Sequence, residues 1–230
     1  MKTETEIADE QAGFRQGRGT RDQITNLRIL MLKAREHQQP LYMCFVDFKK
    51  AFDSISHDKL WVIMMDMGYP LHLIDLLAKL YKKQLARVKV AGTLSEWFRV
   101  KKGVRQGCVL SPYLFNILAE MVIRETLDGF QGGLQIGGRI ITNLRYADDI
   151  ILLATSEAEL QELVDRLDRV SHKCSLLINV DKTMAMASDG IACGILIQNE
   201  LLKQVDTFPY LGSLITEQKI VSVRRNSLSG

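Results

Sequence analysis

Two short apolar runs, each adjoining aspartate, constrain the fold of this chain more than any other feature of its sequence. Residues 41–46 (LYMCFV) end at Asp47, and residues 150–154 (IILLA) directly follow Asp148 and Asp149. Short apolar runs of this kind predict buried β-strands, each with an acid at one end. Helical and strand patterns follow one another without strict alternation, which favours an α+β fold with an antiparallel sheet.

Local patterns predict the other elements. Helices are expected where apolar residues recur at helical spacing, over 58–67 and from Pro70 onward. Two more are expected where a start signal precedes the apolar residues: 112–122, with proline in the first turn, and the segment that follows the capping box at 156–159. Hairpins are expected where turn residues separate apolar runs: 86–91 with 94–101, 134–141 around Gly137-Gly138, and one centred on 146–149. Further short strands are expected at 176–178, 184–187, 192–197 and 208–215.

Composition excludes several classes of protein. The four cysteines of the 230 residues form neither a Cys-x-x-Cys pair nor a zinc spacing, so neither a disulfide framework nor a structural zinc is expected. The N-terminus lacks an apolar signal region, and no apolar run approaches the length of a membrane span. The chain is therefore expected to be a soluble intracellular protein without a membrane partner.

Basic residues are unevenly distributed, although the net charge is only +3. Residues 79–105 contain nine lysines and arginines and one acid, Glu96, and four arginines precede them at positions 15, 18, 21 and 28. Clustered cations suit a nucleic-acid backbone. A solvated protein face is the alternative interpretation.

The aspartates have ordinary explanations when they are taken one at a time. Asp148-Asp149 suits a turn, because aspartate tolerates turn geometry and bonds its own backbone, and Asp47 is a polar residue at the end of a strand. Taken together they suggest more, since Mg²⁺ binds carboxylate oxygens and substrate phosphates. Two such ions about 4 Å apart can clamp both oxygens of an in-line phosphoryl transfer, provided that the two strands pair.

Six sequence blocks extend this suggestion. They occur in the order QAGFRQGRGTRDQI (11–24), FVDFKKAFD (45–53), GVRQGCVLSP (103–112), YADD (146–149), LLINVDKT (176–183) and FPYLGS (208–213). Over about residues 10–216 the chain resembles the reverse transcriptases of non-LTR (LINE-type) retrotransposons. YADD alone is a weak match, but further blocks in the same order make chance a poor explanation.

The resemblance implies a polymerase palm, an antiparallel sheet packed on helices, with partial fingers and no thumb. Residues 1–40 would be a remnant of the fingers and their connection to the palm, and 41–206 the palm with a finger-side insert at about 68–105. Residues 207–216 would form a primer-grip hairpin, and 217–230 a divergent tail that is expected to be disordered. The chain would thus be truncated at both ends, without the basic fingers that precede residue 11 in the family, a thumb or an endonuclease domain.

The resemblance also assigns roles to individual residues. Asp47, Asp148 and Asp149 would be the catalytic acids and would bind two Mg²⁺ ions, for which Mn²⁺ can substitute. The incoming nucleotide would be contacted by Phe52, Gln106, Gly107 and Lys182. The primer and template would be contacted by Arg105, Tyr146, Tyr210, Leu211 and Gly212.

Three of these roles have a physical interpretation and an ordinary alternative. A ring at Phe52 under the nucleotide sugar would collide with a 2′-hydroxyl and select deoxynucleotides, whereas the alternative is a core phenylalanine. Gln106-Gly107 pairs a hydrogen-bonding amide with a residue that allows close approach, or is a simple turn. Lys182 would meet the triphosphate or protonate the leaving pyrophosphate, or is merely solvated.

The implied activity is RNA-directed DNA polymerisation, in which a primer is extended with dNTPs on an RNA or DNA template without an organic cofactor. The family's habit of priming at chromosomal DNA would imply nuclear residence. One rival is a catalytically inactive relic that at most binds nucleic acid. An RNA-dependent RNA polymerase is another, and Phe52 argues against it. Group II intron maturases are the nearest cousins, but residues 105–108 (RQGC) look more LINE-like.

Overall fold

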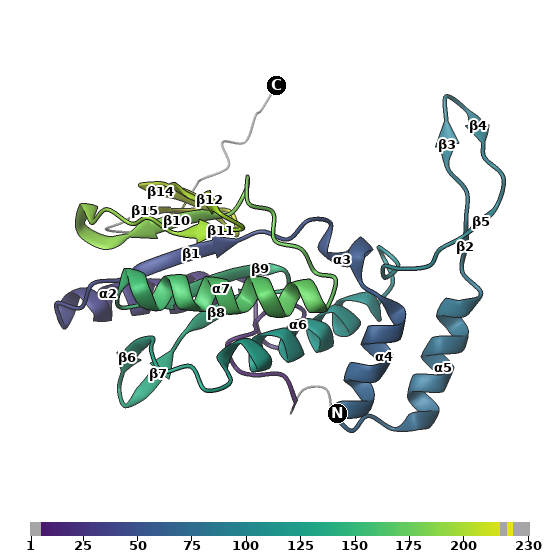
Figure 1. The fold of residues 1–230 in the computed structure, drawn as a ribbon, viewed down its shortest axis with the longest axis horizontal. Coiled ribbons are helices and arrows are strands. Elements are labelled where there is room, and N and C mark those ends of the chain that lie inside the picture. The colour runs from purple at the N-terminus through teal and green to yellow at the C-terminus, as the bar shows by residue number, and fades with distance from the viewer. Residues whose placement is uncertain (1–5, 217–219, 223–230) are drawn as a thin grey trace.

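A five-stranded sheet in the order β13-β10-β1-β9-β8 forms the centre of the structure, a computed structural model that describes residues 6–216 and 220–222 (Figure 1). Its strands are β1 (Tyr42–Val46), β8 (Asn143–Tyr146), β9 (Asp149–Ala154), β10 (Met184–Ala187) and β13 (Lys203–Gln204). All neighbouring pairs are antiparallel except β10 with β13. The predicted α+β class with an antiparallel sheet is therefore confirmed, with one parallel edge pair.

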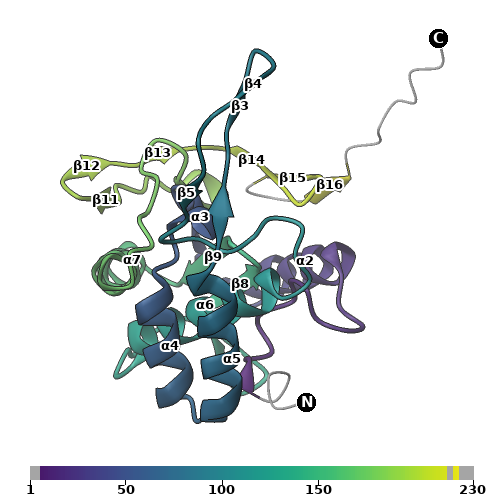
Figure 2. The same cartoon turned by 90° about the vertical axis from the view of Figure 1, so that its right-hand side faces the viewer.

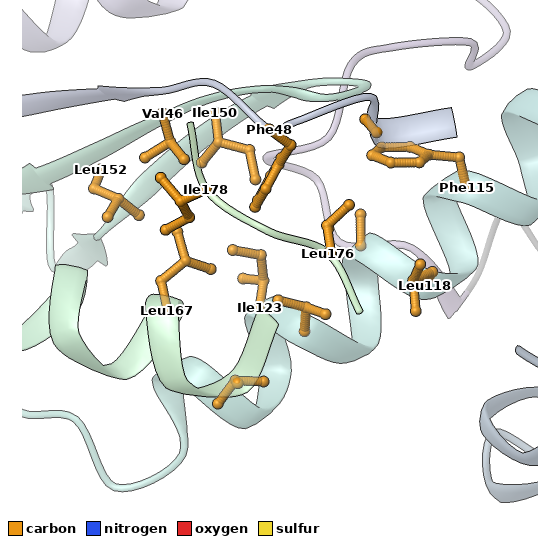
Figure 3. Packing of buried hydrophobic residues seen from close by; sticks show 14 of the residues in the cluster. Val46, Phe48, Phe115, Leu118, Ile123, Ile150, Leu152, Leu167, Leu176 and Ile178 are labelled. Atoms are coloured by element: carbon orange, nitrogen blue, oxygen red, sulfur yellow. The ribbon is translucent and has the colours of Figure 1, made fainter. Parts of the chain in front are cut away.

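Strand β1 is apolar throughout because both faces of the sheet are covered. Cys44 and Val46 belong to the core cluster that includes residues of α6 (Ser111–Leu127) and α7 (Glu157–Lys173). Figure 3 shows the side chain of Val46 on the sheet above Leu167, which comes from α7. Met43 and Phe45 point the other way, into a cluster shared with α2 (Thr20–Glu36). Burial on alternate faces explains the continuous apolar run that precedes Asp47.

The helices around the sheet begin and end largely where their sequences predict. Helix α7 starts after Ser156, whose Oγ accepts a hydrogen bond from the backbone N of Glu159 at 3.2 Å, which is one half of the predicted capping box. The Glu159 carboxylate accepts from the backbone N of Thr155 at 3.0 Å. Proline stands in the first turn of α6. No helix is predicted from the sequence for α2, where the buried stripe is narrow and includes the polar Gln23. Among the described residues, no helix is both long and apolar enough to span a membrane.

Two helices and a ribbon lie beside this core. Helices α4 (His57–Asp66) and α5 (Leu71–Lys82) match the predictions for 58–67 and the segment after Pro70. They lead into a ribbon in which β2 (Leu85–Ala86) pairs with β5 (Phe98–Arg99), and β3 (Lys89–Val90) pairs with β4 (Thr93–Leu94). In both views the ribbon extends away from the sheet and helices (Figure 1; Figure 2). The predicted hairpin of residues 86–101 is thus present as two short ladders.

The remaining elements confirm some predictions and correct others. The short elements are α3 (Ala51–Ser54), β6 (Leu134–Ile136), β7 (Arg139–Ile141), the 3₁₀ turn Ser188–Gly190, β11 (Leu196–Ile197), β12 (Glu200–Leu201), β14 (Thr207–Tyr210), β15 (Ser213–Thr216) and β16 (Ile220–Ser222). The glycines predicted to turn the β6–β7 hairpin have φ of 57° and 78°. Of the strand predicted at 176–178, only Ile178 forms a bridge, with Phe48. Only the last two residues of the strand predicted at 192–197 pair as a strand.

Three residues of the segment that is expected to be a divergent tail, 220–222, form strand β16. Strand β16 pairs antiparallel with β15, so the hairpin predicted at 207–216 extends into a three-stranded sheet. Backbone pairing with β15 gives these residues hydrogen-bonding partners that their sequence alone does not reveal. The other residues of the predicted tail, 217–219 and 223–230, lie outside the described residues.

Candidate catalytic site

Strand pairing brings the two predicted acidic segments to one end of the sheet. The last pair between β1 and β9 joins Val46 to Ile150, so Asp47 follows directly on one strand and Asp149 precedes directly on the other. Asp149 also pairs with Tyr146 across the β8–β9 hairpin, and Asp148 lies in its turn. The pairing that the site requires is therefore present between segments about a hundred residues apart in sequence.

A pocket of about 200 Å³ opens at this end of the sheet. Four of the predicted site residues line it, namely Asp47, Asp149, Lys182 and Tyr210. Its other lining residues are Phe45, Val46, Ile150 and Phe208. The pocket therefore combines two carboxylates, one ammonium group and an aromatic wall.

Negative charge accumulates at this pocket. Partial burial raises the pKa of Asp149 to about 6, with further contributions from the carboxylates of Asp148 and Asp47. Burial also raises the pKa of Asp148, and Asp47 adds to that effect. The carboxylates of Asp47 and Asp148 thus lie close enough to Asp149 to disfavour its ionisation. Raised pKa values of this kind are typical of sites that bind cations or transfer protons.

The donor set fits Mg²⁺, although no group of three or more acidic, histidine or cysteine side chains among the described residues is arranged to enclose a metal. Mg²⁺ is usually bound by one or two carboxylates together with substrate phosphates and water, rather than by an all-protein cage. Asp47 and Asp149, on adjacent strands and open to the same pocket, supply that number of carboxylates.

The raised pKa of Asp149 predicts how the stability of the metal-free protein depends on pH. The folded chain holds the proton up to about pH 6, while the unfolded chain releases it near the ordinary pKa of 3.8. The free energy of unfolding should therefore fall as the pH rises between these values and then level off. Thermal unfolding in EDTA, compared between wild type and Asp149→Asn, measures this dependence.

The difference between the two proteins isolates Asp149. Carboxyls away from the site affect both proteins equally, including Asp9, whose pKa is lowered by its hydrogen bond with Arg18. The variant should gain stability over wild type as the pH rises towards neutrality. A difference in melting temperature that does not change with pH would contradict the raised pKa.

The loop before β10 supports Asp47 from the side. The backbone N of Asp47 donates to Thr183 Oγ1 at 3.2 Å, and its backbone O accepts from the backbone N of Asn179 at 2.8 Å. Thr183 is completely buried, whereas the adjacent Lys182 is exposed and faces the pocket. The block at 176–183 thus holds the strand-end acid and presents a cation, and a role for Thr183 is not predicted from the sequence.

Phe52 and Gln106 lie on the α3 side of the site. The ring of Phe52 is half-buried and stacks on Phe115 of α6, with centroids 4.7 Å apart. The exposed Asp53 carboxylate accepts a long hydrogen bond of 3.5 Å from Gln106 Nε2. Gly107 has φ of 78°, and a Cβ added there would meet no atom within 4 Å, so backbone conformation rather than crowding favours glycine.

Arg105 and its surroundings form a second hollow. Its lining residues enclose about 240 Å³ and include Arg105, Asp53, Gln84 and Lys102. Of the predicted nucleotide-contacting residues, only Lys182 lines the carboxylate pocket, while Phe52, Gln106 and Gly107 lie on the α3 side. The second hollow contains Arg105, which is predicted to contact primer and template.

The predicted primer-grip hairpin is attached to β1 by aromatic contacts. Phe208 stacks on Phe45 with centroids 4.2 Å apart, and Tyr210 lies 6.3 Å from the same ring. Tyr210 is only 3% exposed, and burial with the nearby Asp149 carboxylate raises its pKa. The buried ring of Tyr210 therefore stabilises the hairpin by packing against β1. Leu211 and Gly212, with φ of 48° and 80°, form the turn.

The chain matches a family described as reverse transcriptase (RNA-dependent DNA polymerase) over residues 1–215. A Pol polyprotein of the R2 retrotransposable element of Nasonia vitripennis is 32% identical over 150 residues, covering 65% of this chain and 14% of that protein. The R2DM polyprotein of Drosophila melanogaster is 29% identical over 88% of this chain and 20% of its own length. The polymerase of mobile element jockey of Drosophila funebris is 29% identical, covering 89% of this chain and 23% of its own length.

Solved structures share the fold. Apo telomerase of Candida tropicalis superimposes with a TM-score of 0.67 over 93% of this chain and 41% of that structure, at 16% identity. At that identity the likeness concerns architecture alone, whereas the sequence match over residues 1–215 concerns descent. The chain is thus a member of the reverse transcriptase family, of the kind found in the R2 and jockey non-LTR (LINE-type) retrotransposons, and spans 14% to 23% of the lengths of these relatives.

Proposed function

We propose that the chain is an RNA-directed DNA polymerase palm that extends a primer with dNTPs by two-metal nucleotidyl transfer. The observation that carries the proposal is the convergence of Asp47 and Asp149, with Asp148 beside them, at the ends of paired strands β1 and β9. Under this proposal residues 41–206 are the palm, 68–105 its finger-side insert, 1–40 a finger remnant and 207–216 the primer grip.

Asp47, Asp148 and Asp149 would hold two Mg²⁺ ions, or Mn²⁺ in their place. The chemistry supplied at this site when the ions are bound would be neutralisation of the phosphates and activation of the attacking 3′-hydroxyl. The carboxylates are held at the strand ends and in the adjoining turn, so that binding would require no rearrangement of the backbone. Lys182 faces the same pocket, where its ammonium group can contact the triphosphate and protonate the departing pyrophosphate.

Phe52 is proposed to select deoxynucleotides. Its ring is held against Phe115 and remains partly accessible, so a sugar packed on its free side would have no room for a 2′-hydroxyl. Gln106 and Gly107 are exposed beside it and would complete the nucleotide contact. Tyr146, half-buried at the hairpin, would brace the primer end, and Leu211-Gly212 would form the turn of the grip.

Template and primer are proposed to contact the basic ribbon, defined as residues 85–101, and Arg105 at its base. The ribbon exposes Arg87, Lys89, Arg99 and Lys101 with a single acid, Glu96. Trp97 is 59% exposed, and Arg87 lies 4.9 Å above its ring. Cations interleaved with exposed aromatic rings suit a phosphate backbone and unstacked bases.

Replacing Lys89, Arg99 and Lys101 with glutamine should weaken binding of an RNA–DNA hybrid. Each lost phosphate contact should make the dependence of log K on log salt shallower by about 0.9. Fluorescence anisotropy at several salt concentrations measures both the affinity and this slope.

The matched control neutralises three exposed cations elsewhere, Arg35, Arg169 and Lys203. It has the same net charge as the ribbon variant and should retain nearly the wild-type affinity. Equal losses in the two variants would mean that only the overall charge matters, and that the ribbon is a solvated face.

Primer extension tests the proposed activity directly. The purified chain, a DNA primer, dNTPs and Mg²⁺ or Mn²⁺ are combined with an RNA template and, in parallel, a DNA template. Extension that requires the acidic residues would establish a polymerase. Folded protein that binds the hybrid without extending it would instead favour the inactive relic, whose nucleic-acid binding would rest on the basic ribbon.

A further inference from the structure

The turn that carries the acids contains an unfavourable backbone conformation. Ala147, between Tyr146 and Asp148, has φ of 57°. A residue with a Cβ seldom adopts this conformation, and glycine is usual at hairpin turn positions with positive φ. Such a conformation persists when surrounding contacts impose it. The groups that bond to Ala147 therefore decide where the two following aspartates point.

Both backbone groups of Ala147 are bonded by one side chain from the far N-terminal part of the chain. Gln11 Oε1 accepts from the backbone N of Ala147 at 2.9 Å, and Gln11 Nε2 donates to the backbone O of Ala147 at 3.3 Å. Gln11 Oε1 also accepts from the backbone N of Gly13 at 2.8 Å. The side chain is completely buried, so water does not compete for these bonds.

The segment that carries Gln11 is itself fixed against the turn. Asn116 Nδ2 of α6 donates to the backbone O of Gly13 at 2.9 Å. A Cβ added to Gly13 would lie 2.2 Å from the backbone N of Ala147, so only glycine allows this approach. Backbone bonds from Ala12 to Arg145 and from Arg145 to Glu10 hold the segment alongside β8.

We propose that Gln11 is a positioning residue, which holds the peptide of Ala147 so that Asp148 and Asp149 are presented to metal and substrate. This inference rests on the proposed function, because it concerns the same carboxylates. Gln11 itself touches neither the pocket nor the reacting groups; it acts through the backbone of the turn. Residues that orient metal ligands in this way typically change metal affinity or activity by about 10–100-fold when they are lost.

A purely structural role would give a different pattern, and Gln23 provides the comparison. Its side chain is also buried, and its Nε2 donates to the backbone O of Arg145 at 3.1 Å and of Glu10 at 3.3 Å. Gln23 thus joins the same two chain segments as Gln11, but it bonds Arg145 of β8 instead of Ala147 in the turn. Loss of Gln23 should loosen the segment without releasing Ala147.

The test compares Gln11→Met and Gln23→Met, with Gln135→Met, an exposed glutamine of β6, as a surface control. Three quantities are measured in each variant of the 230-residue chain: thermal stability, Mn²⁺ affinity by electron paramagnetic resonance, and hydrogen exchange at the amide of Ala147. We expect Gln11→Met to bind Mn²⁺ about 10–100-fold more weakly and to exchange the Ala147 amide faster. Gln23→Met should lose stability but retain wild-type Mn²⁺ affinity and amide protection.

Gly13→Ala provides a second perturbation that leaves Gln11 in place. The added methyl group should push the turn away, and it should reduce Mn²⁺ affinity in the same manner as Gln11→Met. If Gln11→Met and Gln23→Met lose Mn²⁺ affinity equally, or if Ala147 stays protected without Gln11, the positioning role is overturned. If wild type binds Mn²⁺ no better than Asp149→Asn, the proposed metal site fails, and the exchange of Ala147 alone decides whether Gln11 holds the turn.

Discussion

Replacing Asp148 and Asp149 together with asparagine is expected to abolish primer extension while the protein remains folded. Asparagine has nearly the same shape as aspartate but no charge, so the variant loses the anionic oxygens that Mg²⁺ requires. Removing preorganised electrostatic groups from an active site typically costs a factor of about 100–1,000 each, and losing both should place extension below detection. Extension by the double variant at the wild-type rate would refute the proposed site.

The same substitution should raise the stability of the metal-free protein at neutral pH. The carboxyl groups of Asp148 and Asp149 both have raised pKa values, because burial and neighbouring negative charge disfavour their ionisation. Two neutral asparagines do not ionise, so the variant avoids the loss of stability that ionisation causes in the folded protein. If the variant is inactive but melts at a higher temperature than wild type, its loss of activity cannot be caused by unfolding. Glu200→Gln with Asp206→Asn, both at exposed positions away from helix ends, controls for the loss of two negative charges.

Removing Glu120 should cause the largest loss of stability. Its carboxylate accepts from Arg145 Nη1 at 3.0 Å, and the two side chains are 2% and 1% exposed. Glu120→Leu would leave the guanidinium of Arg145 buried without this anion, a change that typically costs about 3–5 kcal/mol. Chemical denaturation measures the free energy of unfolding, with Arg124→Met as the control, since Arg124 contacts the same carboxylate from a half-exposed position.

A double variant tests whether the cost comes from the uncompensated charge. Glu120→Leu with Arg145→Met replaces the pair by apolar side chains, which in other buried pairs is often neutral or stabilising. The double variant should therefore regain much of the stability lost by Glu120→Leu alone. If it is instead as unstable as the sum of the two single variants, the pair is not coupled, and the loss arises from packing.

The sequence predicts the sheet and its acids well because the relevant signals are local. An apolar run followed by Asp47 and a hairpin-like Asp148-Asp149 predict where the strands and carboxylates lie, and the capping residue Ser156 predicts the start of α7. The strand expected at 176–178 is reduced to one antiparallel bridge between Ile178 and Phe48, flanked by backbone bonds from Lys49 to Leu177 and from Asn179 to Asp47.

The contacts that hold the site have no such local signal. Gln11 bonds a residue 136 positions away, and nothing around it distinguishes this amide from an exposed one. Buried Asn116 lies among apolar neighbours on α6, and only the fold shows that it reaches Gly13. Strand β16 likewise depends on β15 to provide its partner groups. Where tertiary contacts decide a conformation, a sequence block that resembles a family motif indicates that its residues matter. It does not reveal which residues they contact.

The arrangement of strands also determines when the acids can meet during synthesis. Strand β1 pairs with β9 and β10, whose partner residues lie more than a hundred positions later, so the sheet around Asp47 cannot close until both have left the ribosome. At roughly 5–20 residues per second, that wait lasts on the order of ten seconds. During this interval the apolar residues 42–46 lack their partners, and pairings so distant in sequence form slowly. The nascent chain therefore exposes this apolar segment, and with it a risk of aggregation, until β9 and β10 have been synthesised.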